Sequence, residues 1–159
     1  MKIELETAKR IAGEVVAKLS PYCSRIEVAG SIRRRKSLVK DVDIVLIPSD
    51  PWNLESEVLA LARPFRPKLS GEKLKRFNYN GAQIDLYFTD EKTFGMILLV
   101  RTGSTEHNKK LIAIAKRRGL YFSVARGIEN ERGEVIASKT EKEVFSALGL
   151  NFIPPEERE

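Results

Sequence analysis

Two short segments in which polar and apolar residues alternate constrain this chain most, because they predict two β-strands that each carry carboxylates on one face. In KDVDIVLI, which begins at Lys40, Asp41 and Asp43 alternate with apolar residues, so both aspartates point to the same side of an extended strand. AQIDLYF places Asp85 opposite its apolar residues in the same way. If the two strands are neighbours in one sheet, three carboxylates converge on a small part of its surface.

Three clustered carboxylates repel one another, and burial raises their pKa values further, so the cluster is unfavourable without a cation. Magnesium suits it, because this ion binds carboxylate and phosphate oxygens and completes its shell with water. Two such ions about 3.5–4 Å apart can stabilise the attacking and the leaving oxygen of an in-line phosphoryl displacement. Taken singly, each motif also has an ordinary interpretation, as a solvated strand edge or as part of an amphipathic strand.

The segment before the first aspartates favours the metal interpretation. Gly30 and Ser31 follow an apolar stretch that is typical of a strand. We expect Ser31 to cap a short helix or turn whose first N–H groups bind an anion, and Gly30 to let a triphosphate approach the backbone. Arg33 and Arg34 add forked donors that match phosphate oxygens. The combined order of these motifs predicts a nucleotide site.

GSIRRRKSLVKDVDIVLI together with QIDLYF resembles the palm of the family X DNA polymerases, the polymerase beta group of the nucleotidyltransferase superfamily. The likeness covers nearly the whole chain. The opening KIELETA resembles the start of that palm, with Lys2 where an arginine reaches the triphosphate and Glu4 in place of a proline. RTGSTEHNKKL resembles the segment that joins the palm to the nucleotide-selecting subdomain, and ASKTEKEVFSALGLNFIPPEERE resembles the C-terminal end of that subdomain.

The resemblance implies a role for each matching residue. Asp41, Asp43 and Asp85 would bind two Mg²⁺ ions, for which Mn²⁺ can substitute, and Asp85 would help to take the proton of the primer 3′-hydroxyl. DNA would be contacted by Lys109, near the templating base, and by Lys110. The residues that contact the incoming nucleotide would be Lys2, Gly30, Ser31, Arg34, Arg101, Gly103, Ser104 and Asn108.

Three departures from the family pattern bear on substrate selection. Val100 and Arg101 replace a Tyr-Phe pair that lies against the incoming sugar, which leaves the choice between deoxy and ribo substrates open. Ile112 stands where an arginine probes the minor groove of the new base pair, so modest fidelity is predicted. Ser123-Val124-Ala125 replaces a polar Asn-Glu-Tyr stretch. His107 is expected to be structural rather than catalytic.

These segments predict an α+β (mixed α/β) fold with a nucleotidyltransferase palm over residues 1–101, in which a mixed sheet packs on helices, and a small α+β C-terminal lobe over residues 102–159. Asn80-Gly81 predicts a tight hairpin turn, and Trp52 and Leu59 are expected in the core. Pro154-Pro155 predicts the end of regular structure and an exposed tail. The periodicity predicts helices over about 5–19, 52–62, 92–100, 105–118 and 140–148, strands over 25–29, 41–47, 73–78 and 82–88, and a small sheet over 121–136.

The composition agrees with a partner rich in phosphate. The 159 residues carry a formal net charge of +6, with a pI near 9.5. We expect the chain to act as a monomer on the primer 3′ end of gapped or recessed DNA, with a dNTP as substrate and a repair protein as partner. No lyase or helix-hairpin-helix segment precedes the palm, so removal of deoxyribose phosphate is not expected.

The chain is expected to be cytoplasmic and associated with the nucleoid. No apolar run approaches the ~20 residues that span a membrane, and the N-terminus lacks the apolar region of a signal peptide. The single cysteine, Cys23, excludes an internal disulfide and is expected to be a buried thiol.

Four functions are compatible with these motifs. The leading hypothesis is a DNA-directed polymerase that fills short gaps in repair. A second keeps the chemistry but drops the template, as a terminal nucleotidyltransferase does, because the minor-groove arginine is absent. A third is a minimal nucleotidyltransferase that modifies a protein or a small molecule, although such relatives usually end after the palm. A non-catalytic nucleic-acid binding module is disfavoured, because all three carboxylates are present.

Overall fold

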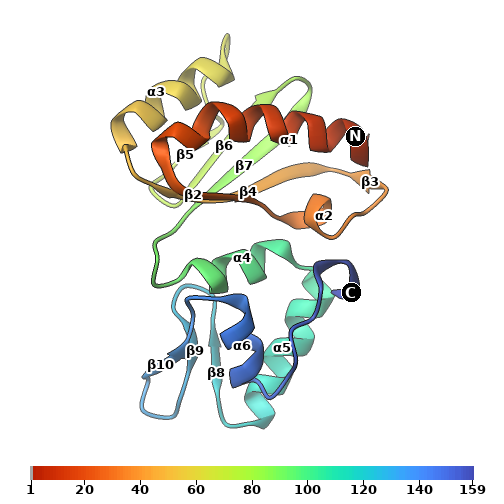
Figure 1. The fold of residues 1–159 in the computed structure, drawn as a ribbon, viewed down its shortest axis with the longest axis vertical. Coiled ribbons are helices and arrows are strands. Elements are labelled where there is room, and N and C mark those ends of the chain that lie inside the picture. The colour runs from red at the N-terminus through yellow and green to blue at the C-terminus, as the bar shows by residue number, and fades with distance from the viewer. Residues whose placement is uncertain (1) are drawn as a thin grey trace.

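The computed structural model describes residues 2–159, and Figure 1 shows a larger sheet with its helices above a smaller one. The helices are α1 (Leu5–Leu19), α2 (Gly30–Arg33), α3 (Pro51–Ala62), α4 (Phe94–Thr102), α5 (Thr105–Arg117) and α6 (Glu141–Ala147), with 3₁₀ turns η1 (Ser20–Tyr22) and η2 (Pro155–Glu157). The strands are β1 (Ile3–Glu4), β2 (Cys23–Val28), β3 (Leu38–Val39), β4 (Asp41–Pro48), β5 (Leu69–Ser70), β6 (Leu74–Tyr79), β7 (Ala82–Phe88), β8 (Tyr121–Ser123), β9 (Gly127–Glu129) and β10 (Val135–Ala137). The predicted α+β class is confirmed.

The larger sheet has five strands in the order β2-β4-β7-β6-β5. The β4–β7 pair is parallel and the other pairs are antiparallel, which makes the sheet mixed as predicted. The β6–β7 turn has positive φ at Asn80 (50°) and Gly81 (80°), the backbone that a tight Asn-Gly hairpin requires. One face of the sheet packs on α1 and α3, and its apolar residues form the largest core cluster. The other face carries the aspartates.

Helix α4 covers part of that second face and also belongs to the smaller lobe. Phe94 and Leu98 pack on sheet residues such as Val45, whereas Met96 and Leu99 join the core of the C-terminal lobe. The lobe itself is a three-stranded antiparallel sheet, β10-β9-β8, with α5 and α6. Because α4 contributes to both cores, the sheet and the lobe are held against each other. The predicted division between residues 101 and 102 falls one residue before the end of this helix and stays a prediction.

The prediction that Trp52 and Leu59 are core residues is wrong. Trp52 is 83% exposed and Leu59 is 47% exposed, whereas Leu54 and Val58 on the same helix are buried. Helix α3 carries apolar residues around much of its circumference, so periodicity alone does not identify the face that packs on the sheet. The start of α3 is set by Asp50, whose side chain accepts a hydrogen bond from the backbone N–H of Asn53 at 3.2 Å.

Two further expectations are corrected. The C-terminal tail is not uniformly exposed, because Arg158 is fully buried and only the residues around it are open to solvent. Ser31 does not cap α2: the helix begins at Gly30, and its N-cap is Ala29, which makes no side-chain bond. The expectation of a buried thiol at Cys23 is met only in part. That side chain is half-buried, and burial raises its pKa to about 11.

Within residues 2–159, none of the helices combines the length and the apolar character that crossing a bilayer needs.

Candidate active site

The strand register brings the three predicted aspartates together on one face of the sheet. In the parallel β4–β7 pair, Asp43 lies opposite Asp85, and Asp41 lies opposite Gln83. Paired residues of adjacent strands point to the same side, so Asp43 and Asp85 are direct neighbours and Asp41 follows two positions away. Asp85 is 3% exposed, and the other two are half-buried.

The carboxylates nevertheless do not form a ready ion cage. Among residues 2–159, no three acidic, histidine or cysteine side chains are gathered as ion ligands. On β6, Arg76 is paired with Asp85 across the antiparallel β6–β7 ladder. Its Nε donates to Asp85 Oδ1 at 2.7 Å and its Nη2 to Oδ2 at 3.3 Å. The expected convergence is thus present in the backbone register, while the carboxylate of Asp85 is directed to an arginine.

The electrostatics of Asp43 fit a hard divalent cation. Burial, together with the neighbouring carboxylates of Asp85 and Asp41, raises the pKa of Asp43 to about 7. A hydrogen bond from the Tyr87 hydroxyl to Asp43 Oδ1, 3.4 Å long, and the positive charge of Arg101 act in the opposite direction. A cation bound to these oxygens would remove the repulsion, and oxygen-only donor sets suit magnesium.

Gly30 leaves the space beside this carboxylate open. Its φ is +61°, and a Cβ at this position would run into an oxygen of Asp43. The N–H of Ala29 donates to the Asp43 carbonyl at 2.8 Å, which fixes the start of α2 against β4. A residue other than glycine would therefore both strain the backbone and fill the space in front of the aspartate.

A cavity of about 450 Å³ opens between α2, β4 and the end of α4. Eight predicted site residues line it: Gly30, Ser31, Arg34, Asp41, Asp43, Arg101, Gly103 and Asn108. Its other walls are Lys40, Tyr87, Val100, Thr102 and Thr105. The polar and charged residues of the two lobes thus face one shared space, as a nucleotide site requires. Tyr87 could have been found from sequence, because it lies two residues after Asp85 and so on the same strand face.

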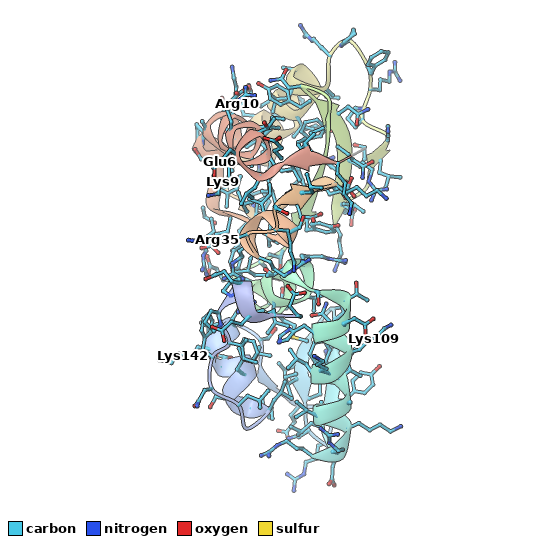
Figure 2. The ribbon with its side chains drawn as sticks, turned by 90° about the vertical axis from the view of Figure 1, so that its right-hand side faces the viewer. Glu6, Lys9, Arg10, Arg35, Lys109 and Lys142 are labelled. Carbon is cyan, nitrogen blue, oxygen red and sulfur yellow. The ribbon has the colours of Figure 1, made fainter. Side chains whose placement is uncertain are left out.

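Five predicted site residues do not line this cavity. Asp85 lies beside it on β7, and Lys2 is exposed next to β1. Ser104 caps α5, since its Oγ accepts from the N–H of His107 at 3.1 Å. Lys109 projects from the surface of α5 (Figure 2) and lies 3.3 Å from Glu106. Lys110 donates to the carbonyl of Glu159 at 2.9 Å. Their predicted contacts with nucleotide or DNA stay predictions.

Arg33 and Arg34 both reach from α2 to the end of α4. Arg34 Nη1 donates to the Thr102 carbonyl at 2.6 Å, and Arg33 Nη1 donates to Thr102 Oγ1 at 2.9 Å. Arg33 also forms a two-pronged pair with Glu141, both N–O distances being 2.7 Å. Glu141 in turn binds Arg158, with the shorter distance 2.7 Å. Sequence reasoning missed this buried arginine–glutamate–arginine network, because its members are far apart in the chain.

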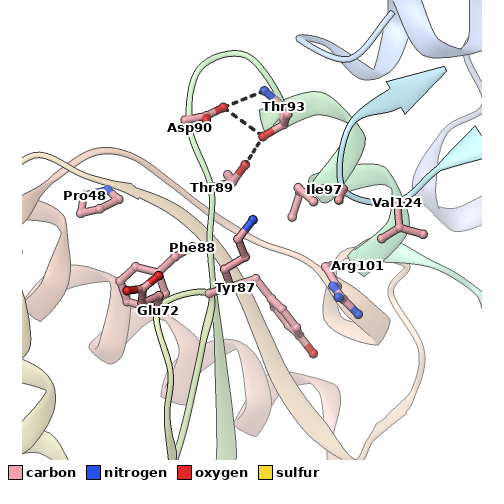
Figure 3. A pocket seen from close by; sticks show the side chains of 12 residues that line it. Pro48, Glu72, Tyr87, Phe88, Thr89, Asp90, Thr93, Ile97, Arg101 and Val124 are labelled. Atoms are coloured by element: carbon pink, nitrogen blue, oxygen red, sulfur yellow. Dashed lines mark hydrogen bonds between the residues drawn. The ribbon is translucent and has the colours of Figure 1, made fainter. Parts of the chain in front are cut away.

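Arg101 and Tyr87 form a pair at the mouth of the site. The guanidinium carbon of Arg101 lies 4.4 Å from the centre of the Tyr87 ring, a cation–π contact. Figure 3 shows both residues in a second cavity of about 430 Å³, next to the hydrogen-bonded Asp90–Thr93 turn. Burial and then Asp43 raise the pKa of Tyr87 to about 12, so its hydroxyl stays protonated and can donate to that carboxylate.

The side chain of Asn108 makes one hydrogen bond and has one free acceptor. Its Nδ2 donates to the carbonyl of Val100 at 2.9 Å, which ties α5 to α4. Its buried Oδ1 has no partner within residues 2–159. A buried acceptor without a partner is unfavourable, so a ligand in the cavity that donates to this oxygen would gain a hydrogen bond.

His107, in the first turn of α5, is buried as a neutral ring. It is 4% exposed, and its ring centre lies 6.1 Å from that of Phe145. Burial, aided by the charge of Arg158, lowers the pKa of His107 to about 4. These surroundings agree with the structural role expected for it.

Acid should therefore destabilise the protein through His107. Its folded-state pKa is below the ordinary value of 6.5, so the unfolded chain binds more protons between pH 6.5 and about 4. We expect a loss on the order of 2–3 kcal/mol as the pH falls through this window. His107→Phe should flatten the pH dependence there, as measured by urea unfolding followed by circular dichroism. Because His107 is the only histidine in the sequence, no other imidazole contributes to this pH dependence. Equal slopes of unfolding free energy against pH for the two proteins would contradict the prediction.

Comparison with known proteins agrees with this site. Residues 97–159 match the family model of the DNA polymerase beta thumb. The chain is 35% identical to the DNA polymerase/3′-5′ exonuclease PolX of Bacillus subtilis, over 96% of this chain and 28% of that protein. It is 26% identical to rat DNA polymerase lambda, over 82% of this chain and 28% of that protein. It is also 26% identical to the repair DNA polymerase X of African swine fever virus, over 99% of this chain and 95% of the viral protein.

The chain thus spans about a quarter of the length of the bacterial and the rat relative, and nearly all of the viral one. The matches extend over both the aspartate-bearing sheet and the thumb-like lobe. The chain belongs to family X of the DNA polymerases, the polymerase beta group of nucleotidyltransferases.

Proposed function

We propose that this chain adds dNTPs to a DNA 3′-hydroxyl and fills short gaps in repair. The observation that carries the proposal is the β4–β7 register, which sets Asp43 beside Asp85 at the edge of a cavity that also contains Gly30 and Arg34. The names of the relatives, which are repair and lambda-type polymerases, support the same chemistry.

Each part of the site has a distinct task in this proposal. Gly30 and Ser31 present backbone and hydroxyl groups to the triphosphate, and Arg34 neutralises its charge. Asp41 and Asp43 hold the ion that accompanies the triphosphate, and Asp85 accepts the proton of the primer 3′-hydroxyl. Two Mg²⁺ ions, or Mn²⁺ in their place, would supply charge stabilisation at the reacting oxygens. Asn108 offers its free Oδ1 to the incoming nucleotide.

DNA is the proposed macromolecular partner. The formal net charge of +6 favours a phosphate-rich ligand, and Lys109 and Lys110 stand on the first turns of α5, beside the cavity. Salt should weaken DNA binding strongly, because phosphate contacts release counterions. We propose that the chain works as a monomer near the nucleoid, and that a repair protein delivers it to its gaps.

Template-independent extension is a second candidate. Ile112 is 44% exposed on α5 and cannot donate hydrogen bonds to a minor groove. Val100 and Arg101 line the cavity where relatives carry an aromatic pair, so the wall against the sugar is changed. These two features weaken the checks on base pairing and on the sugar, without altering the carboxylates.

One primer-extension experiment tests the proposal. Gapped, recessed and single-stranded DNA are each offered with the four dNTPs or the four rNTPs, one at a time, in Mg²⁺ or Mn²⁺. We expect templated addition on gapped and recessed DNA, with errors more frequent than in a polymerase that has the minor-groove arginine. Rates would be read on sequencing gels.

The other outcomes are equally informative. Addition of every nucleotide to single strands, independent of the template, would select the terminal transferase instead. Absence of addition to any DNA in either metal would refute both. The Asp85→Ala variant, purified in the same way, is the matched control for contaminating polymerases, and the metal-free reaction tests whether addition depends on the ion.

A further inference from the structure

Arg76 is the charged partner of Asp85 in this structure. The antiparallel β6–β7 register pairs the two residues directly, so both side chains lie on the face that carries the aspartates. The guanidinium engages both carboxylate oxygens, at 2.7 and 3.3 Å. The side chain of Asp85 is 4% exposed, whereas that of Arg76 is 32% exposed. The carboxylate is enclosed, and the arginine has an open path to solvent.

A second donor completes the enclosure of Asp85. Gln83 Nε2 lies 3.3 Å from Oδ1 and 3.5 Å from Oδ2 of the same carboxylate. Each oxygen therefore faces two N–H donors, which leaves little lone-pair capacity for an ion. Asp43 differs, since its side chain receives one long hydrogen bond from Tyr87, at 3.4 Å. Of the two neighbouring carboxylates, one is open to a cation and the other is occupied.

We propose that Arg76 is a positioning residue that keeps Asp85 from the catalytic metal until a primer end arrives, and that the released guanidinium then binds the terminal phosphodiester of the primer. The inference rests on the proposed function. An arginine and a divalent cation compete for the same oxygens and repel each other at this range. A DNA phosphate resolves the conflict, because it accepts the same forked hydrogen bonds that the carboxylate gives up.

The exposure of Arg76 makes this exchange sterically simple. Its side chain reaches solvent on the face of the sheet that carries the aspartates, so it can turn away from Asp85 without vacating the apolar core. Binding of the primer end and binding of the catalytic metal should therefore favour each other, because each takes one partner of the Arg76–Asp85 pair. In the absence of DNA, the site should therefore bind metal mainly through Asp41 and Asp43.

The first test measures Mn²⁺ binding to the full chain without DNA, by calorimetry and by the rise in melting temperature. Arg76→Met should bind Mn²⁺ about 10-fold more tightly than the wild type, and its metal-free melting temperature should fall. Arg76→Lys, which keeps the charge but loses the fork, should lie between the two. Lys75→Met is the matched control, because Lys75 carries the same charge but contacts Ser70 and the Phe88 ring, away from Asp85.

The second test measures binding of a duplex with a recessed 3′ end, with and without Mn²⁺. Mn²⁺ should tighten binding by the wild type about 5-fold or more and should have little effect on Arg76→Met. Without metal the two proteins should bind alike. A purely structural arginine would change the melting temperature but would not produce this metal-dependent difference.

Unchanged or weaker Mn²⁺ affinity in a folded Arg76→Met protein would overturn the inference. If that variant does not fold, Arg76→Gln, which keeps a neutral donor, is judged by the same Mn²⁺ titration. A wild-type protein that extends no primer would refute the proposed polymerase activity, and the titration would still decide whether Arg76 withholds Asp85 from metal.

Discussion

Replacing Asp43 by asparagine should abolish nucleotide transfer and, without metal, make the protein more stable at neutral pH. The loss of activity is expected to exceed about 1,000-fold, because the variant loses a charged oxygen that faces both the triphosphate and its ion. The gain in stability has a separate cause. Burial, together with Asp85 and Asp41, raises the pKa of Asp43 to about 7, so ionising it in the folded protein is costly.

The sign of the pH effect follows from proton binding. Between about pH 4 and 7 the folded protein binds more protons at Asp43 than the unfolded chain does, so the metal-free wild type loses stability as the pH rises through this window. The loss is on the order of 2–4 kcal/mol and persists above pH 7. Asp43→Asn should not show it. Urea unfolding in chelator at pH 5 and pH 8 measures the difference.

With Mg²⁺ present, the wild type should instead be more stable than Asp43→Asn. The ion stabilises the folded wild type by binding to it, whereas the variant has lost a carboxylate ligand. Asp50→Asn is the matched control: Asp50 caps α3 far from the site, and asparagine caps equally well, so neither activity nor stability should change. If Asp43→Asn retained activity, or if its metal-free stability followed that of the wild type at both pH values, the assigned role would be wrong.

Replacing Glu141 by glutamine should be the most destabilising single change outside the apolar core. Glu141 is 6% exposed and stands between Arg33 and the fully buried Arg158. Burial alone would raise its pKa, yet hydrogen bonds from Arg33 and Arg158 hold the pKa of Glu141 below its ordinary value. Removing the negative charge leaves the fully buried guanidinium of Arg158 and the partly buried one of Arg33 without compensation, at a cost of about 3–5 kcal/mol.

Urea unfolding at pH 7, followed by circular dichroism, measures the loss. Glu156→Gln, an exposed acid in η2, should change stability by less than about 0.5 kcal/mol. The double variant Glu141→Leu with Arg158→Met should recover part of the loss, because an apolar replacement removes one of the uncompensated charges. Equal stability of Glu141→Gln and wild type would mean that the network carries little net energy.

Local patterns were enough for the parts of the fold that local geometry determines. Helix α1 and the β6–β7 hairpin follow from periodicity and from an Asn-Gly turn, and alternation puts Asp41 and Asp43 on one face of β4 and Asp85 opposite the apolar residues of β7. The parallel pairing of β4 with β7 joins residues 42 positions apart, and no local pattern specifies it.

The errors arose where distant residues decide the outcome. Arg158 looked like part of a charged tail, because its partner Glu141 lies 17 positions away in the sequence. Arg76 carried no sequence signal, since its link to Asp85 depends on hairpin register. Ser31 resembled a cap, but the helix already begins at Gly30, so Ser31 lies inside it.

The exposed position of Trp52 has a consequence for spectroscopy. It is the single tryptophan, and in the folded state its indole is already surrounded by water. Its emission will be red-shifted in native and denatured protein alike, so intrinsic fluorescence is a poor reporter of global unfolding. The same indole sits away from the catalytic face, on a helix that packs against the opposite side of the sheet, which makes it a suitable anchor for a dye that leaves the chemistry undisturbed.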